Sequence, residues 1–241
     1  MNIHIPKKIH VSWKDTDILS SDHIFARRCV QSLVKNSDGW SIEFSTDNDV
    51  DTYLKDNLDR ADYLLLSECH IVEKLDVWRL IKMYNGGGIY SDIDRMCNTS
   101  INEILQPNTK CVLPTCEDDN FSQDFMCSAP GNPIYSTTIG LVLERRKAGH
   151  TNTYFLGPQT YMHGVTKVLL GEIVDVNPGA FAFEEIRKVM NEMPFMETYR
   201  ETPPYDTYLF RPKFDLDDFE HEYMKRDFYR KSGIGHWTGD W

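Results

Sequence analysis

The sequence has no long hydrophobic run and little positive charge. Its apolar runs fall far short of the roughly 18 residues that a membrane helix needs. The polar N-terminus, which carries Lys7 and Lys8, does not resemble a signal peptide. A net charge of −11 repels phosphate backbones and so argues against nucleic acid as a partner. These absences predict a soluble, cytoplasmic protein without a transmembrane segment.

Several catalytic and metal-binding patterns are also missing. None of the 6 cysteines forms a CxxC pair, and no His/Cys set with zinc spacing is present. No serine lies in a GxSxG turn, and Gly86–Gly88 lacks the Lys-Ser/Thr of a P-loop. We therefore expect the cysteines to be mostly buried thiols of a reducing compartment.

The residues that are present predict an α/β fold. With 41% hydrophobic and 12% aromatic residues, the 241-residue chain suffices for one domain over residues 1–241. We divide it into a nucleotide-binding half (1–110) and an acceptor-side half with a C-terminal flap (111–241). Hydrophobic periodicity predicts strands over Ile3–Trp13, Trp40–Ser45, Ile89–Ile93, Lys110–Leu113 and Phe125–Ser128, and helices over Asp22–Leu33, Val50–Leu58, Ala61–Leu66, Ile71–Tyr84, Pro133–Ala148 and Pro158–Leu169. Residues 171–241 show few clear periods.

This order of elements predicts a mixed, mostly parallel sheet flanked by helices. On the strand predicted over Ile89–Ile93, alternation places Tyr90, Asp92 and Asp94 on one face. Two carboxylates at a strand end make a hard oxygen site for Mg²⁺ or Mn²⁺. The alternative is a solvated acidic turn.

Asp76 and Arg79 are three residues apart and so share one face of a helix that is apolar on most sides. Buried charges are costly unless they are paired or bound to a ligand. The pair is either a structural ion pair or a contact for a phosphorylated donor, and the sequence favours neither.

Aromatic residues mark both ends of the chain. Trp13 ends the first predicted strand, where an indole belongs to the core or serves as a stacking platform for a base. The last six residues hold His236 and Trp241, which suit either a packed tail or a flap that closes over a ligand, with His236 as a nitrogen ligand of the metal.

Together these motifs resemble glycosyltransferase family 32, the group with a DXD sugar-binding region. The resemblance rests on the opening Ile5-Pro6-Lys7-Lys8-Ile9-His10-x-x-Trp13, the central Asp76-x-x-Arg79-x-x-x-x-Tyr84-x-Gly86-Gly87-Gly88-Ile89-Tyr90-x-Asp92-x-Asp94, the later Asp124-Phe125-Met126 and Gly157-Pro158, and the closing His236-Trp237-x-Gly239-x-Trp241. The clostridial glucosylating toxins share the central spacing. Gln123 stands where members often carry Asn, and Asp240 where Ser is common.

The resemblance implies a GT-A fold and a metal-dependent, retaining hexosyltransferase. The expected partners are a UDP- or GDP-hexose and a glycan or other hydroxyl acceptor, and the expected cofactor is Mn²⁺ or Mg²⁺. The alternatives are a nucleotide-sugar hydrolase and a catalytically silent binding module. Because the membrane anchor of Golgi members is not seen, we expect a bacterial or viral enzyme. The expected catalytic residues are Asp76, Arg79, Asp92 and Asp94; the donor contacts Val11, Ser12, Trp13, Asp76, Arg79, Tyr90, Asp92 and Trp241; the metal ligands Asp92, Asp94 and His236; and the acceptor-side residues Gln123 and Asp124.

Overall fold

The computed structural model describes residues 5–19, 24–97, 100–105, 110–113, 121–173, 199–201 and 218–232. In the first half, strands and helices alternate as the hydrophobic periodicity predicts. The elements are β1 (Lys8–Ser12), η1 (Thr16–Leu19), α1 (Ile24–Asn36), β2 (Ser41–Ser45), α2 (Asp47–Asn57), α3 (Arg60–Ser67), α4 (Ile71–Gly86) and β3 (Gly88–Ser91).

The described residues of the second half supply the rest of the sheet and several further helices. Its elements are α5 (Ile101–Ile104), β4 (Cys111–Leu113), β5 (Phe125–Ser128), α6 (Pro133–Lys147), η2 (Phe155–Gln159), α7 (Thr160–Leu170), β6 (Tyr199–Glu201) and α9 (Asp218–Ser232). The helix predicted from Pro158 starts instead with η2, a π-helical turn that contains this proline. Helix α9 was not predicted, because its sequence is dominated by charged residues and gives no clear apolar stripe.

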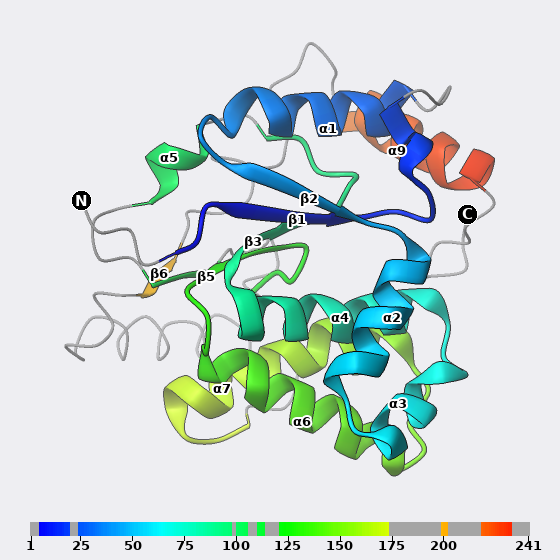
Figure 1. The fold of residues 1–241 in the computed structure, drawn as a ribbon, viewed down its shortest axis with the longest axis vertical. Helices are drawn as coiled ribbons and strands as arrows, with labels where there is room; N and C mark the ends of the chain where they lie inside the picture. The colour runs from blue at the N-terminus through cyan, green and yellow to red at the C-terminus, as the bar shows by residue number, and fades with distance from the viewer. Residues whose placement is uncertain are drawn as a thin grey trace.

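The six strands form one mixed sheet in the order β2-β1-β3-β5-β4-β6. Strand β1 pairs in parallel with β2 and β3, whereas β5 pairs antiparallel with β3 and β4, and β6 runs parallel to β4. The predicted α/β class and mixed sheet are confirmed. Helices cover both faces: α1 and α9 lie on one side, and α2, α3, α4, α6 and α7 on the other (Figure 1).

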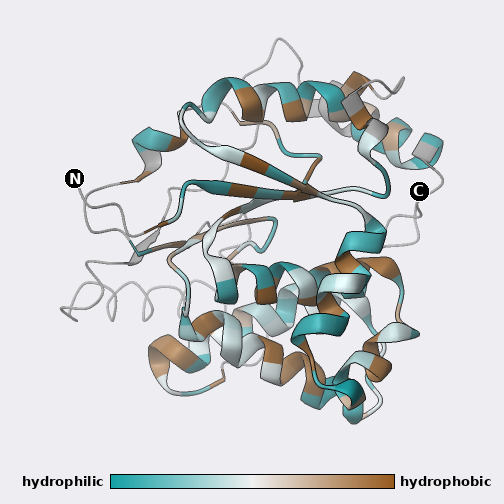
Figure 2. Cartoon of the chain, viewed as in Figure 1, coloured by the Kyte–Doolittle hydropathy of each residue, from teal (hydrophilic) through white to brown (hydrophobic). Residues whose placement is uncertain are grey.

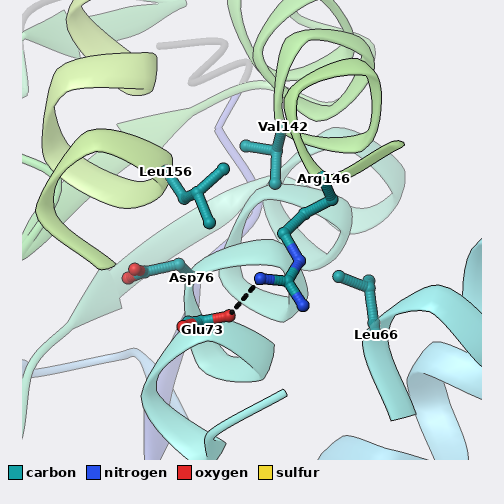
Figure 3. A pocket seen from close by; sticks show the side chains of 6 residues that line it. All are labelled: Leu66, Glu73, Asp76, Val142, Arg146 and Leu156. Carbon is teal, nitrogen blue, oxygen red and sulfur yellow. Dashed lines mark ion pairs between the residues drawn. The ribbon is translucent and has the colours of Figure 1, made fainter. Parts of the chain in front are cut away.

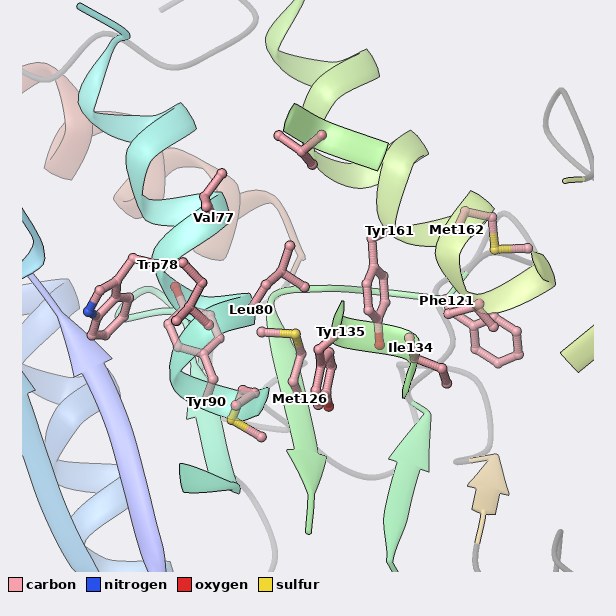
Figure 4. Close-up of a cluster of buried hydrophobic side chains, with 14 of the residues drawn as sticks. Val77, Trp78, Leu80, Tyr90, Phe121, Met126, Ile134, Tyr135, Tyr161 and Met162 are labelled. Atoms are coloured by element: carbon pink, nitrogen blue, oxygen red, sulfur yellow. The ribbon is translucent and has the colours of Figure 1, made fainter. Parts of the chain in front are cut away.

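Alternating strand residues pack into separate hydrophobic cores on the two faces of the sheet. Ile9, Val11 and Ile89 pack with Leu33 of α1, whereas Tyr90 packs beneath α4, where Trp78 meets it edge-on with 6.0 Å between ring centroids (Figure 4). Hydrophobic stretches lie in the central strands, while α2 is largely hydrophilic (Figure 2).

No helix in the described ranges has the length and hydrophobicity needed to span a bilayer. Cys29, Cys97, Cys111 and Cys127 are buried free thiols, as expected.

The strand predicted over Ile89–Ile93 ends earlier, at Ser91, so the alternation argument for Asp92 and Asp94 was wrong. The Asp92 amide donates to the Asp124 carbonyl (2.8 Å), and the Arg95 amide donates back to the Asp92 carbonyl (3.2 Å). These two bonds turn the backbone directly after β3. Both carboxylates therefore project from a turn rather than from one face of a strand.

The glycines before β3 are required by close backbone contacts. At Gly88, with φ at +100°, a Cβ would lie 2.5 Å from the Lys8 carbonyl oxygen of β1. At Gly87, with φ at +60°, it would lie 2.7 Å from the Ser128 carbonyl oxygen. Only glycine permits this backbone conformation and this approach. The glycine run therefore lets α4 turn sharply into the centre of the sheet.

Candidate active site

The sheet topology brings Trp13 and Asp92 to the same edge. Strands β2 and β3 flank β1 on opposite sides, and the helices that precede them, α1 and α4, cover opposite faces of the sheet (Figure 1). In open α/β sheets, ligands bind beyond the carboxyl ends of the strands at such a reversal. Trp13 directly follows β1 and Asp92 directly follows its parallel neighbour β3.

Arg79 is the centre of a buried network at this edge. Its Nη2 lies 2.7 Å from Asp76 Oδ1, and its Nη1 lies 3.2 Å from Asp92 Oδ1. The same Nη1 donates to the backbone carbonyl of Gln123 (3.1 Å), and the guanidinium lies 4.7 Å from the centroid of the Tyr90 ring. The structure thus joins α4, β3 and the segment before β5 through one planar side chain.

Tyr90 and Gln123 complete the network. The Tyr90 hydroxyl donates to Asp92 Oδ1, the oxygen that also faces Arg79. Gln123 Nε2 donates to Asp76 Oδ1 (3.2 Å). Gln123 Oε1 is buried and accepts no hydrogen bond from the described residues. Because an unpaired buried acceptor is costly, this oxygen is available to a donor group such as a ligand hydroxyl.

Gly157 of the π turn η2 makes room for the Asp76 carboxylate. A Cβ at Gly157 would lie 2.2 Å from Asp76 Oδ2 and 3.0 Å from Gln123 Nε2. Single π turns inside helices occur frequently at functional sites. The sequence motif Gly157-Pro158 therefore has a concrete steric role beside the Arg79 network.

Burial sets the charge states of the two carboxyls that face Arg79. It raises the pKa of Asp76 to about 6, although the neighbouring Arg79 acts in the opposite direction. Burial also raises the pKa of Asp92 to about 6, and again Arg79 opposes the change. The Asp92 side chain is the more accessible of the two, with 30% of its surface exposed.

Asp94 lies in a different environment, against helix α9. Lys225 Nζ lies 2.9 Å from Asp94 Oδ2, and the Tyr229 hydroxyl donates to the same oxygen (3.1 Å). Burial alone would raise the pKa of Asp94, but Lys225 and Arg95 outweigh it and hold this pKa below its usual range. Asp94 is therefore ionised throughout the physiological range.

The residues present fit a divalent cation. Asp94 Oδ1 is buried and accepts no hydrogen bond from the described part of the chain, and an ionised carboxylate oxygen without a donor suits a hard cation. No group of three His, Cys, Asp or Glu side chains able to hold a metal occurs among the described residues. A metal at Asp92 and Asp94 would therefore need further oxygen ligands.

Trp13 is buried rather than open. Only 7% of its surface is exposed, and it packs among Ile18, Phe25 and Ile93. The ring of Phe228 from α9 stacks on it, with centroids 4.7 Å apart and planes at 25°. Val11 and Ser12, the other donor contacts expected on this strand, are buried within β1.

Asp124, which the sequence predicts on the acceptor side, is held by its neighbours. Arg95 forms an ion pair with its Oδ2, and the Ser122 hydroxyl donates to its Oδ1. Its backbone carbonyl holds the Asp92 amide, so this residue also fixes the turn that carries the DXD motif. The imidazole of His10 contacts the Gly87 carbonyl through Nε2 (3.1 Å).

A pocket opens on the helical side of Asp76 (Figure 3). Its empty volume is about 210 Å³, part of which is open to solvent. Glu73 and Arg146 form an ion pair of 3.5 Å across it, and the remaining lining is apolar: Leu66, Val142 and Leu156. Among the described residues that line this pocket, Asp76 is the one that also belongs to the Arg79 network.

Sequence reasoning missed the residues of α9 that reach the site. Lys225, Phe228 and Tyr229 contact Asp94 and Trp13, yet they are more than 130 positions from either residue in the sequence. No local motif marks them. His236 and Trp241, the expected metal ligand and donor contact of the tail, lie outside the described residues.

Comparison with known proteins points in the same direction as the geometry. Residues 4–110 match the family described as a glycosyltransferase sugar-binding region containing a DXD motif. Inositol phosphoceramide mannosyltransferase 1 of Schizosaccharomyces pombe (strain 972 / ATCC 24843) is 26% identical over 135 residues, which are 56% of this chain and 42% of that protein. The matched region thus spans less than half of that relative. Among solved structures, PaToxG glycosyltransferase aligns with a TM-score of 0.51 at 18% identity, over 93% of this chain and 84% of that one.

A mixed sheet with a DXD turn at its topological reversal is typical of a GT-A-like α/β fold. The PaToxG structure, which aligns over most of the chain, has the same fold. The family match over residues 4–110 is more specific. Over these residues, which are less than half of its length, the chain is similar to the glycosyltransferase sugar-binding region containing a DXD motif.

Proposed function

We propose that this protein transfers a hexose, with retention of configuration, from a UDP- or GDP-sugar to a hydroxyl acceptor. The observation that carries the proposal is the Arg79 guanidinium of α4, which pairs with Asp76 of the same helix and with Asp92 at the carboxyl end of β3. A fixed, planar cation beside two carboxylates suits a ligand that combines phosphates with hydroxyl groups.

The buried network would hold the donor sugar. Asp76 and the unpaired Gln123 Oε1 are acceptors for sugar hydroxyls, while Arg79 supplies positive charge toward the leaving diphosphate. Tyr90 orients Asp92 through its hydroxyl. Because these side chains are locked by one another before a ligand arrives, little reorganisation is needed during the reaction.

Asp92 and Asp94 would hold Mn²⁺ or Mg²⁺, with His236 as a further ligand from the tail. When bound, the cation supplies Lewis-acid stabilisation of the charge that develops on the diphosphate. With retention, the acceptor hydroxyl approaches from the face that the leaving group vacates, and the departing phosphate takes its proton. This route requires no enzyme nucleophile.

The nucleotide would lie along the end of β1. We assign Val11, Ser12 and the indole of Trp13 to the base and ribose, together with Trp241 of the tail. Gln123 and Asp124 border the acceptor side. The yeast relative is a mannosyltransferase by name, so a nucleoside diphosphate mannose is the first donor to test beside the glucose donors.

Product analysis tests the proposal. The protein is incubated with UDP- and GDP-hexoses and Mn²⁺, with and without glycan acceptors, and released nucleotide is compared with transferred sugar. Transfer that depends on the acceptor supports the proposal. Release of free hexose at the same rate in both reactions identifies a hydrolase, and donor binding without turnover identifies a silent module.

The metal assignment has its own test. Addition of EDTA should abolish turnover, and Asp94→Asn should lower it by roughly a hundredfold or more, as for other charge-stabilising groups. His236→Ala should weaken the Mn²⁺ dependence more than it lowers the melting temperature. Full activity in EDTA would exclude the metal. Superimposable Mn²⁺ titrations of wild type and His236→Ala would exclude His236 as a ligand.

A further inference from the structure

One face of helix α9 covers both ends of the proposed donor site. Lys225, Phe228 and Tyr229 are spaced at i, i+3 and i+4, so they share this face. Lys225 and Tyr229 contact Asp94 Oδ2 at 2.9 and 3.1 Å, and Phe228 stacks on Trp13 at 4.7 Å. We call these three residues the α9 face.

Two of these contacts would imitate parts of the proposed donor complex. The Lys225 ammonium is a cation on the carboxylate assigned to the metal, and the Phe228 ring is an aromatic plane on the indole assigned to the base. An ammonium beside Asp94 and a divalent ion on the same carboxylate would stand only a few ångströms apart, where like charges repel strongly. The two cations therefore compete.

We propose that the α9 face is an internal competitor of the donor, which occupies the metal and base positions and withdraws when the metal–nucleotide complex binds. This inference rests on the proposed function, because that function assigns Asp94 and Trp13 to metal and base.

The packing of α9 suits a helix that docks reversibly. Phe228 is 2% exposed and lies 6.1 Å from Phe25 of α1, so a small aromatic cluster holds the helix against α1. On its exposed side, Asp227 forms ion pairs with Arg230 and Lys231 of the same helix. These local pairs move with α9 and do not oppose its withdrawal.

A fixed helix is the opposing possibility. In that case Lys225 orients Asp94 for the metal, and its loss weakens metal binding. The two arrangements predict opposite changes in Mn²⁺ affinity for a variant that removes the charge of Lys225 but keeps the length of its side chain. Lys225→Met is that variant, and Lys225→Arg keeps the charge.

The experiment measures Mn²⁺ affinity by calorimetry in the presence of saturating UDP, and again with GDP. Lys225→Met should bind Mn²⁺ at least about tenfold more tightly than wild type, because a like charge is gone from the site. Lys225→Arg should match wild type. Lys231→Met, on the exposed side of the same helix, is the matched control and should also match wild type.

A second variant covers the case in which Lys225→Met fails to fold. Tyr229→Phe removes one donor to Asp94 Oδ2 and keeps the aromatic packing, so a smaller gain in Mn²⁺ affinity is expected. Amide hydrogen exchange of wild type gives a separate readout. Binding of Mn²⁺ and UDP should lower protection in α9 and leave that of α6 unchanged.

The outcomes separate the two proposals. Equal or weaker Mn²⁺ binding by Lys225→Met, or unchanged exchange in α9, overturns the competitor while the metal site stands. An absence of Mn²⁺ binding in every variant, including wild type, overturns the metal assignment and the competitor together. Tighter binding by Lys225→Met with no sugar transfer keeps the competitor and removes only the transferase activity.

Discussion

Arg79 Nη2 lies 2.7 Å from Asp76 Oδ1, one helical turn away on α4, and both side chains are buried. A buried pair of this kind contributes less to stability than its Coulomb energy suggests, because both charges lose their hydration. Arg79 also contacts Asp92 and the Gln123 carbonyl, and a purely local ion pair would not require these contacts. We therefore assign the pair to the proposed site as well as to the helix.

Replacement of Arg79 by lysine separates these two roles. Arg79→Lys keeps the charge but cannot donate to Asp76, Asp92 and the Gln123 carbonyl at once. Sugar turnover should fall by about a hundredfold, the effect of a lost charge-stabilising group, while circular dichroism stays native. Arg146→Lys, in the ion pair outside the network, is the control and should retain most activity. If Arg79→Lys unfolds, the pair is structural.

Gly157→Ala should displace the Asp76 carboxylate, since its Cβ would lie 2.2 Å from Oδ2. We expect turnover to fall more than tenfold and the unfolding free energy to fall by about 1–3 kcal/mol, as for overpacking. Gly140→Ala in α6 has no atom within 4 Å of its Cβ and should be neutral or slightly stabilising.

A double-mutant cycle identifies the cause. In the Asp76→Ala background, where the carboxylate is gone, Gly157→Ala should cost far less than in wild type. Additive losses in turnover and stability would mean that Gly157 acts elsewhere.

The raised pKa of Asp76 predicts how stability changes with pH. The native carboxyl, with a pKa of about 6, holds its proton more tightly than the unfolded one, whose value is 3.8. The unfolding free energy therefore falls as pH rises from about 4 to about 6, by an amount of order 1–3 kcal/mol. Urea titrations at pH 4, 5, 6 and 7 should show a smaller fall in Asp76→Asn.

Asp227 serves as the control for this prediction. Its pKa is lowered by Lys231 and Arg230, so its contribution is present above the unfolded pKa and is lost as pH falls. Asp227→Asn should therefore leave the decline between pH 4 and 6 intact. If the unfolding free energy changes with pH in parallel for wild type and Asp76→Asn, Asp76 is not the cause of the decline.

Trp13→Phe tests the assignment of the indole to the nucleobase. Phenylalanine preserves much of the apolar packing with Ile18 and Phe228 but offers a smaller surface for stacking. Affinity for UDP or GDP should fall by up to about 1–3 kcal/mol, the range for loss of a base stack, measured by calorimetry. Trp40→Phe, in the separate cluster with Leu33, is the control. Unchanged nucleotide affinity in Trp13→Phe would mean that Trp13 is a core residue and does not stack on the base.

Much of the fold could be predicted because periodicity is a local property. The buried helix α4 was recognised from its apolar residues on most sides, and β5 was predicted with the bounds that it has. The DXD strand was extended too far because the bonds that bend it, from Asp92 to Asp124 and from Arg95 to Asp92, are invisible to alternation. Whether Asp76 and Arg79 merely pair could not be settled from spacing, since Gln123 lies 44 residues from Arg79.

The α9 contacts were beyond sequence reasoning for a related reason. The segment around Phe228 carries so much charge that its hydrophobic face is only a few residues wide. Lys225 gives no local sign that its partner is Asp94. Only the three-dimensional arrangement shows that this late helix returns to the first strand.

The position of β5 has a consequence for how the chain can be divided. The family match ends at residue 110, but β3 is flanked on one side by β5, which begins at Phe125. A protein cut after residue 110 would leave the hydrogen-bonding groups of β3 exposed along an open edge, and such edges recruit strands from other molecules. It would also lose the Gln123 carbonyl that anchors Arg79. The DXD region is thus a unit of recognisable sequence without being a unit of folding, and expression of that fragment alone should give aggregates.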